Sequence, residues 1–237
     1  MRAPKERSLE GSTDAQVAAV LAWLKAHGKQ TTVDGMARYG IPSERAVGVG
    51  VGELRAYAKG LGPRHALAVA LWDTGGYEAR MLTAYLGVAG ELTGAQMDRW
   101  WLEFDNWSHV DTLCFHLFDR SPLAWERVRP WSRHEGEFQR RAAFALLWSL
   151  ALHDKGASDE QFAEGLALIE RTSEDPRNFV KKAVAMALGA IGRRPSMKAA
   201  VTALAERLAA SPQAPARWIG RDALQAGRRA SSKTAVP

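Results

Sequence analysis

The stretch Phe138-Gln139-Arg140-Arg141-Ala142-Ala143-Phe144-Ala145-Leu146-Leu147 decides the predicted fold. In it, an aromatic residue is followed three places later by a basic residue and then by an Ala-rich apolar run. The same order recurs elsewhere as Tyr77/Arg80, Phe179/Lys182 and Trp218/Arg221, and Trp107 opens a similar segment with Val110 at the basic place. Phe179 follows Phe138 by 41 residues, and Trp218 follows Phe179 by 39 residues. These spacings are close to the ~40 to 47 residue period of HEAT and armadillo helix pairs.

This recurrence predicts an all-α protein, an α-solenoid of HEAT-like helical repeats in which the recurrent helices line a concave basic face. Composition points the same way, since 41 Ala and 24 Leu stand against 14 Val and 4 Ile, a ratio that disfavours a large sheet. The alternative is that Ala-rich amphipathic helices resemble one another without forming a repeat.

The 237 residues suffice for one sizeable domain, and the 46% hydrophobic and 24% charged fractions are typical of globular proteins. Capping-box patterns at Thr13/Gln16, Thr93/Gln96 and Ser158/Gln161 mark helix starts. We predict a flexible N-terminus over 1–12, a single HEAT-like-repeat domain over 13–226 and a disordered tail over 227–237. The predicted helices cover 14–27, 52–60, 63–73, 77–87, 94–104, 107–118, 122–130, 137–153, 159–171, 177–192, 197–209 and 215–226.

A cytoplasmic, nucleoid-associated location is expected. Cys114 is the single cysteine, so no intramolecular disulfide can form, and the longest apolar run, 142–152, is too short for a membrane span. We therefore expect no membrane partner. The net charge of +6 favours an anionic partner, nucleic acid first, although a solvated basic surface gives the same composition.

Trp107 and Asp111 form the most informative pair. Asn106 is a good N-cap, which places Trp107 and Asp111 at i and i+4 of one helix face. An indole beside a carboxylate suits a cationic ligand or a developing oxocarbenium ion. The alternative is a partly buried Trp beside a solvent-facing Asp.

Basic residues at the equivalent repeat positions would align along the groove and follow a phosphate backbone. A solvated basic face is the alternative. The predicted DNA-binding residues are Arg80, Arg140, Lys181, Lys182, Arg193, Arg194 and Arg221, with Arg141 at the site itself. The glycine-rich run 48–52 lacks the spacing of a dinucleotide-binding loop and is predicted to be a flexible turn. No metal site and no cofactor are expected.

These segments resemble the AlkD family of DNA alkylation repair glycosylases over roughly residues 50 to 225. The motifs are 52–59, Leu71-Trp72 with 77–80, 104–107 through Asp111, 140–147 and 178–184. The resemblance implies a HEAT-like fold and an excision site in which Trp107, Asp111 and Arg141 match three family residues. The family's second site Trp is replaced by Met186, and an Arg behind it by Gly189.

The resemblance implies a monofunctional glycosylase that hydrolyses the N-glycosidic bond of N3- or N7-alkylated purines in duplex DNA and acts as a monomer. Met186 and Gly189 are assigned to the substrate groove, where a thioether and a missing side chain would widen the groove toward bulky adducts. Alternatively, Met186 packs in a shifted core. Two other functions stay open: a non-catalytic DNA-binding or damage-sensing HEAT-like protein, and a protein-interaction scaffold.

Overall fold

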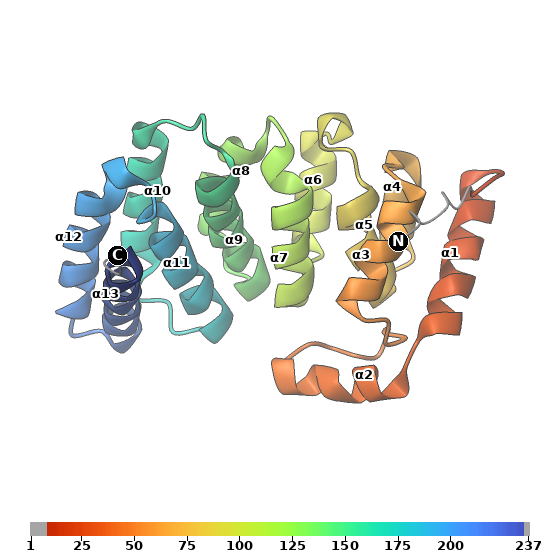
Figure 1. Cartoon of the computed structure of the whole chain (residues 1–237), viewed down its shortest axis with the longest axis horizontal. Helices are drawn as coiled ribbons and strands as arrows, with labels where there is room; N and C mark the ends of the chain where they lie inside the picture. The colour runs from red at the N-terminus through yellow and green to blue at the C-terminus, as the bar shows by residue number, and fades with distance from the viewer. Residues whose placement is uncertain (1–8, 235–237) are drawn as a thin grey trace. The chain divides into compact units, whose positions relative to one another are not determined.

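The computed structural model describes residues 9–234, with side chains described as far as Gly227. Over these residues the chain is all-α and contains no strand, as predicted. By their contacts these residues divide into a first compact unit up to Pro122 and a second from Leu123, and the single repeat domain stays a prediction. The cartoon in Figure 1 follows the helices in chain order from α1 to α13.

The first unit contains seven α-helices in its described part. They are α1 (Thr13–His27), α2 (Gln30–Met36), α3 (Val51–Leu61), α4 (His65–Asp73), α5 (Tyr77–Leu86), α6 (Gly94–Leu102) and α7 (Trp107–His116). Three short 3₁₀ turns join them: η1 (Ala37–Tyr39), η2 (Ala89–Glu91) and η3 (Phe118–Arg120). The sequence predicted all of these α-helices except α2.

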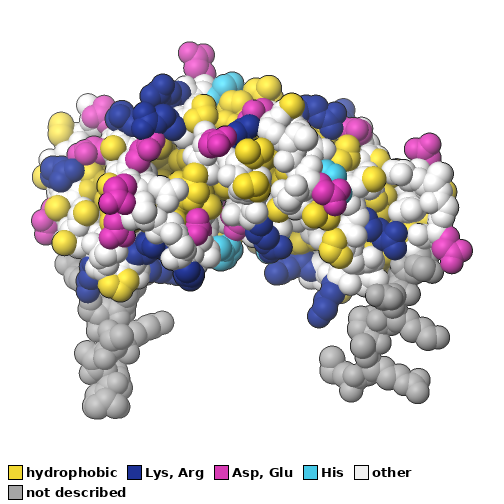
Figure 2. Space-filling model, turned by 90° about the horizontal axis from the view of Figure 1, so that it is seen from above, with side chains coloured by type: hydrophobic (Ala, Val, Ile, Leu, Met, Phe, Trp, Pro, Cys, Tyr) yellow, Lys and Arg dark blue, Asp and Glu magenta, His cyan; other side chains and the backbone are white. Residues whose placement is uncertain are grey.

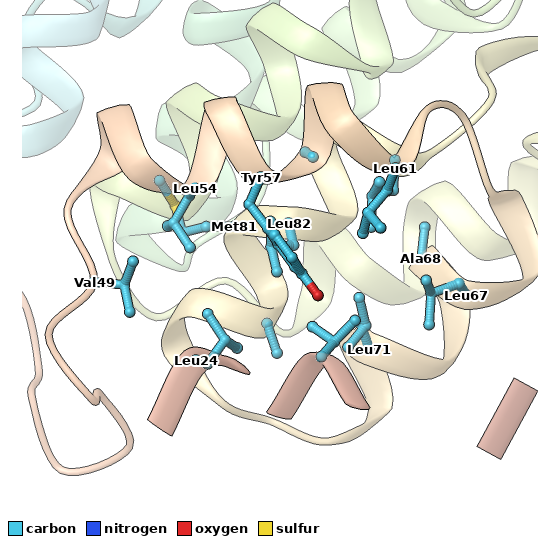
Figure 3. Packing of buried hydrophobic residues seen from close by; sticks show 14 residues of the cluster. Leu24, Val49, Leu54, Tyr57, Leu61, Leu67, Ala68, Leu71, Met81 and Leu82 are labelled. Carbon is cyan, nitrogen blue, oxygen red and sulfur yellow. The ribbon is translucent and has the colours of Figure 1, made fainter. Parts of the chain in front are cut away.

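Apolar residues spaced three or four apart on α3 build the core of this unit. Leu54, Tyr57 and Leu61 are buried and lie on the face of α3 that meets side chains from the neighbouring helices (Figure 3). α5 packs against α3, α4 and α7. Full burial of one such Leu side chain stabilises the fold by roughly 1.5 to 3 kcal/mol.

The described residues of the second unit form six α-helices. They are α8 (Ala124–Ser132), α9 (Glu137–His153), α10 (Asp159–Thr172), α11 (Asn178–Ile191), α12 (Lys198–Ala209) and α13 (Ala214–Thr234), with the 3₁₀ turn η4 (Pro195–Met197) before α12. α9 lies beside α11, and α13 packs on both α11 and α12 (Figure 1).

The recurrent aromatic residues lie at the same end of neighbouring helices. Phe138 of α9 contacts Phe179 of α11, with ring centroids 5.4 Å apart, and the Lys181 ammonium lies 4.8 Å from the Trp218 ring centroid of α13. In the first unit, Tyr77 of α5 bonds to Ser108 of α7. The recurrent helices therefore run parallel within each unit, as expected of repeats.

Helix starts follow the predicted chemistry with one shift. Ser158 and Gln161 form a complete capping box, and the Thr93 side chain accepts from the Gln96 amide. At α1 the N-cap is Ser12 instead of Thr13, because the Ser12 hydroxyl is the group that accepts a backbone N–H. α13 continues to Thr234, where disorder was predicted from residue 227, since Ala and Arg are strong helix formers. Residues 1–8 and 235–237 of the predicted flexible ends lie outside the described residues.

Candidate nucleic-acid interface

Trp107 and Asp111 are both on α7, and the start of this helix is fixed by buried polar groups. The Asn106 side chain is almost fully buried and accepts a 2.9 Å hydrogen bond from the His109 amide, which makes it the N-cap. Its Nδ2 donates to His109 Nδ1 and to Asp105 Oδ1, both at 2.7 Å. The first turn of α7 is therefore held by its cap, as the sequence predicted.

His109 extends this network to the neighbouring helix. Because its Nδ1 accepts from Asn106, we place the ring proton on Nε2, which lies 3.0 Å from the Tyr77 carbonyl oxygen. Burial raises the pKa of Tyr77, whose hydroxyl donates a 2.9 Å hydrogen bond to Ser108 Oγ.

The Trp107 side chain is partly exposed, and its indole is oriented by the main chain. Its Nε1 donates a 2.8 Å hydrogen bond to the carbonyl oxygen of Tyr39 in the turn η1. Tyr39 itself is 64% exposed. Asp111, one helical turn after Trp107, is also partly exposed. The two residues thus share one face of α7, as predicted. The turn η1, which binds the Trp107 indole, was not predicted to be part of the site.

The glycine-rich run 48–52 is held by an internal anion. The buried Glu78 carboxylate accepts from the backbone N–H groups of Val47, Gly48 and Val49, the shortest bond being 2.7 Å from Gly48. Gly48 has φ +88°, and a Cβ there would lie 2.1 Å from the Lys29 carbonyl oxygen. The predicted flexible turn is therefore a fixed one, and its N–H groups bind a carboxylate of the protein itself.

Arg80 is held inside the first unit. Its guanidinium forms a 2.6 Å ion pair with Glu103 and lies 4.5 Å from the Trp72 ring centroid, while the Trp72 indole donates to the same carboxylate. The side chain is only 13% exposed. The charge predicted to meet phosphate is therefore balanced within the protein, and a DNA contact by Arg80 stays a prediction.

Arg140 and Arg141 join α9 to the start of α11 in the second unit. Arg141 is buried and donates a 2.7 Å hydrogen bond to the Phe179 carbonyl oxygen. Arg140 forms a 2.7 Å ion pair with Asp175, which also binds Arg177. Burial alone would raise the pKa of Asp175, but hydrogen bonds from Arg177 and Arg140 outweigh it and lower the pKa to about 2.

Of the other predicted DNA-binding residues, one is also held by the fold. Arg194 donates to the Asp154 and Ala157 carbonyl oxygens and lies over the Phe162 ring. Lys182, Arg193 and Arg221 are exposed, and Lys181 is partly exposed beside Trp218. On the face drawn in Figure 2, Lys and Arg side chains form separate groups with Asp and Glu side chains between them.

Met186 and Gly189 lie on the exposed face of α11, in line with Lys182 and Arg193. Met186 is 42% exposed, so it is not packed in a shifted core. Both residues line an open cavity of about 960 Å³ that is bordered by α11, α12 and α13, and Trp148 of α9 forms part of its wall. A Cβ at Gly189 would meet nothing within 4 Å. No motif in the sequence indicates that Trp148 borders this space.

The predicted three-residue site draws on both units, with Trp107 and Asp111 in the first and Arg141 in the second. Its assembly stays a prediction. Within the part of the chain that the structure describes, no group of three His, Cys, Asp or Glu side chains could hold a metal ion. No helix among the described residues is long and apolar enough to cross a membrane.

The profile of the DNA alkylation repair enzyme family matches residues 20–229. The chain belongs to this DNA alkylation repair enzyme family. The resemblance read from the motifs is therefore confirmed at the level of the family. A comparison with curated proteins finds no match to this sequence.

The fold of this DNA alkylation repair family member is similar to that of a solved structure with 20% sequence identity. The TM-score is 0.72, and the alignment covers 80% of this chain and 82% of the other. That protein is described as belonging to a new family related to the HEAT-like repeat DNA glycosylases, with affinity for branched DNA structures. The similarity confirms the predicted HEAT-like helical repeats.

Proposed function

We propose that this protein is a monofunctional DNA glycosylase that hydrolyses the N-glycosidic bond of N3- or N7-alkylated purines in duplex DNA. The observation that carries the proposal is the pairing of the Trp107 indole with the Asp111 carboxylate on one face of α7, in a member of the DNA alkylation repair enzyme family. In this proposal the protein acts as a monomer, without a cofactor, in the nucleoid-containing cytoplasm.

The chemistry needs few groups because alkylation at N3 or N7 gives the purine a positive charge. Cleavage of the C1′–N bond returns the electron pair to the base, which leaves as a neutral molecule and needs no general acid. The positive charge moves to the sugar as an oxocarbenium ion. Asp111 stabilises that ion, orients a water molecule toward C1′ and accepts the proton that the water loses.

Trp107 and Arg141 complete the proposed site. The Trp107 ring would pack against the cationic base, for which cation–π attraction contributes about 0.5 to 2 kcal/mol. The Tyr39 carbonyl oxygen holds the ring in a fixed orientation, which lowers the entropy lost on binding. Arg141 would hold a neighbouring phosphate through charge-assisted hydrogen bonds, which requires its buried guanidinium to exchange the Phe179 carbonyl oxygen for the phosphate.

The exposed cations of the second unit form the proposed backbone-binding surface. Lys182, Arg193 and Arg221 lie on α11, the turn after it and α13, and Lys181 is supported by Trp218. Positive side chains that are not held by an internal carboxylate can replace counterions on phosphates. The open space at Met186 and Gly189 supports tolerance of bulky purine adducts.

The decisive experiment is base release from randomly methylated duplex DNA, with free 3-methyladenine and 7-methylguanine measured by mass spectrometry. The matched control is the Asp111→Asn variant, prepared in the same way. We expect release by the wild type and none above background by the variant. Equal release by both would contradict the proposed mechanism.

A second candidate is a DNA-binding protein of the same fold that does not excise bases. Two observations favour it: Met186 replaces the aromatic residue that the family resemblance implies, and Arg141 is buried against Phe179. The similar solved structure, described as having affinity for branched DNA, supports testing a four-way junction beside a linear duplex. Tight binding to the junction, combined with no release of methylated base, would favour this candidate.

A further inference from the structure

Trp148 stands apart from the rest of its helix. From Arg141 to Ala151, every residue of α9 except Trp148 is buried. Trp148 forms part of the wall of the cavity bordered by α11, α12 and α13. A partly exposed Trp at a cavity wall contributes a large aromatic surface to that wall.

The remaining wall of this cavity is formed mostly by small or apolar side chains. Ala185, Gly189 and Ala190 line it from α11, and Val201 and Ala205 line it from α12. Trp148 is the single aromatic residue among the described lining residues. Glycine inside a helix costs about 1 kcal/mol relative to Ala, and at Gly189 the missing side chain leaves the cavity open.

Charge at the edge of the cavity is mixed, with cations in excess. Arg193 and Lys198 line it, Asp222 supplies one negative charge, and Lys182 lies one turn before Met186 on the exposed face of α11. A volume of about 960 Å³ lies at the upper end of the range for small-molecule sites, ~300 to 1,000 Å³. An aromatic wall, a flexible thioether and flanking cations fit a flat apolar group that is attached to a polyanion.

We propose that Trp148 is a specificity-determining residue that stacks on a planar aromatic group carried by DNA, inside the cavity between α11, α12 and α13. The inference rests on the proposed DNA binding, but it does not require excision. Met186 adapts to the edge of the group, and Lys182, Arg193 and Lys198 hold the flanking phosphates. Asp222 selects against a second anion inside the cavity.

The test measures binding to three fluorescein-labelled duplexes of one sequence. One duplex is unmodified, one contains a tetrahydrofuran abasic site, and one carries a pyrene joined to a single guanine by a short alkyl linker. Wild-type protein should bind the pyrene duplex about tenfold more tightly than the unmodified duplex, which is the scale of one aromatic stacking contact. The abasic duplex should show no comparable gain, because it lacks the planar group.

Substitutions separate stacking from general DNA affinity. Trp148→Leu should reduce the preference for pyrene to within about twofold while affinity for the unmodified duplex is retained. Trp148→Phe should keep most of the preference because it keeps a ring. The matched control is Trp125→Leu on α8, another partly exposed indole of the same unit that does not line the cavity. Thermal unfolding of each variant verifies that it is folded.

The outcomes also separate this inference from the proposed glycosylase activity. Loss of the pyrene preference in Trp148→Leu supports the inference even where the wild type releases no methylated base. A preference that is unchanged in Trp148→Leu, or absent in the wild type, overturns it even where excision is observed. Concentration-dependent self-association that Trp148→Leu abolishes would assign the cavity to a second copy of the chain and likewise overturn the inference.

Discussion

The Trp107 indole N–H donates a 2.8 Å hydrogen bond to the carbonyl oxygen of Tyr39, 68 residues earlier in the chain. The acceptor is a main-chain atom, so the orientation of the indole depends on the position of the turn η1 instead of on a particular side chain. Asn106, as the N-cap, fixes the start of α7, the helix that begins at Trp107. Trp107 is therefore positioned twice, once through its ring and once through its helix.

We expect Trp107→Phe to lower the rate of methylpurine release about tenfold. The variant keeps an aromatic face but loses the N–H that orients the ring, and one hydrogen bond is worth up to about 1.5 kcal/mol, of which about 1.4 kcal/mol corresponds to a tenfold change in rate. Single-turnover base release measures the effect. Trp125→Phe is the matched control, since it removes an indole N–H that bonds to Asp154 in the second unit. An equal loss in both variants would indicate a general effect on folding.

Asp111→Asn should lower base release by at least about 10²-fold while DNA affinity stays the same or rises slightly. An amide neither stabilises an oxocarbenium ion as an anion does nor accepts the proton from water, and removal of a negative charge favours binding to DNA. Asp73→Asn on α4 is the control, because it removes an exposed negative charge from the same unit. Unchanged turnover in Asp111→Asn would contradict the role of the carboxylate.

Most of the fold could be predicted from the sequence, because caps and apolar spacing are local signals. The short helix α2 could not, since QTTVDGM buries only Met36 and carries two β-branched Thr in its first turn. The capped pair on α7 was likewise readable from Asn106, Trp107 and Asp111. The parts of the site that the sequence did not reveal depend on partners distant in the chain.

Arg80 is one residue whose partner could not be predicted from the sequence. The position of Arg80 in the repeat predicted a phosphate contact. The group that binds it is instead Glu103, which comes 23 residues later in the chain, directly after α6. Trp148 is similar, because only the packing of α9 against α11 brings its ring to the cavity wall. Sequence spacing identifies the face of a helix, whereas the identity of the side chains that meet it depends on tertiary packing.

Asp175 should give the protein an acid-sensitive component of stability. Its pKa is about 2 in the folded protein and near 3.9 in an unfolded chain, so the unfolded state binds the proton more readily. The contribution is complete above about pH 5 and is lost as the pH falls toward 2. Between about pH 6 and pH 3, the free energy of unfolding measured in urea should fall by about 1 kcal/mol more in the wild type than in Asp175→Asn. Identical pH profiles would contradict the assigned pKa.

Lys182→Ala should weaken binding to all duplex sequences and reduce the slope of log affinity against log salt by about one unit. Lys182 is exposed on α11, in line with Arg193, so its ammonium can replace a counterion on a phosphate. Lys155→Ala is the matched control, because Lys155 is exposed in the α9–α10 connection and bonds to the Leu152 carbonyl oxygen. An unchanged slope in Lys182→Ala would mean that this side chain touches no phosphate.

Met186→Trp should shift excision toward small adducts. Met186 is 42% exposed at the cavity and has Gly189 one turn further on, so an indole there would fill space that a bulky purine adduct would occupy. Methyl adducts do not need that space, and their release should change little. The ratio of methyl to bulky-adduct release should rise about tenfold, the scale on which a pocket rejects excess volume. Gly189→Ala provides a milder version, because one methyl group enters open space without touching a neighbour. A constant ratio in both variants would show that the substrate does not enter this cavity, and the proposed tolerance of bulky adducts would then have to arise elsewhere.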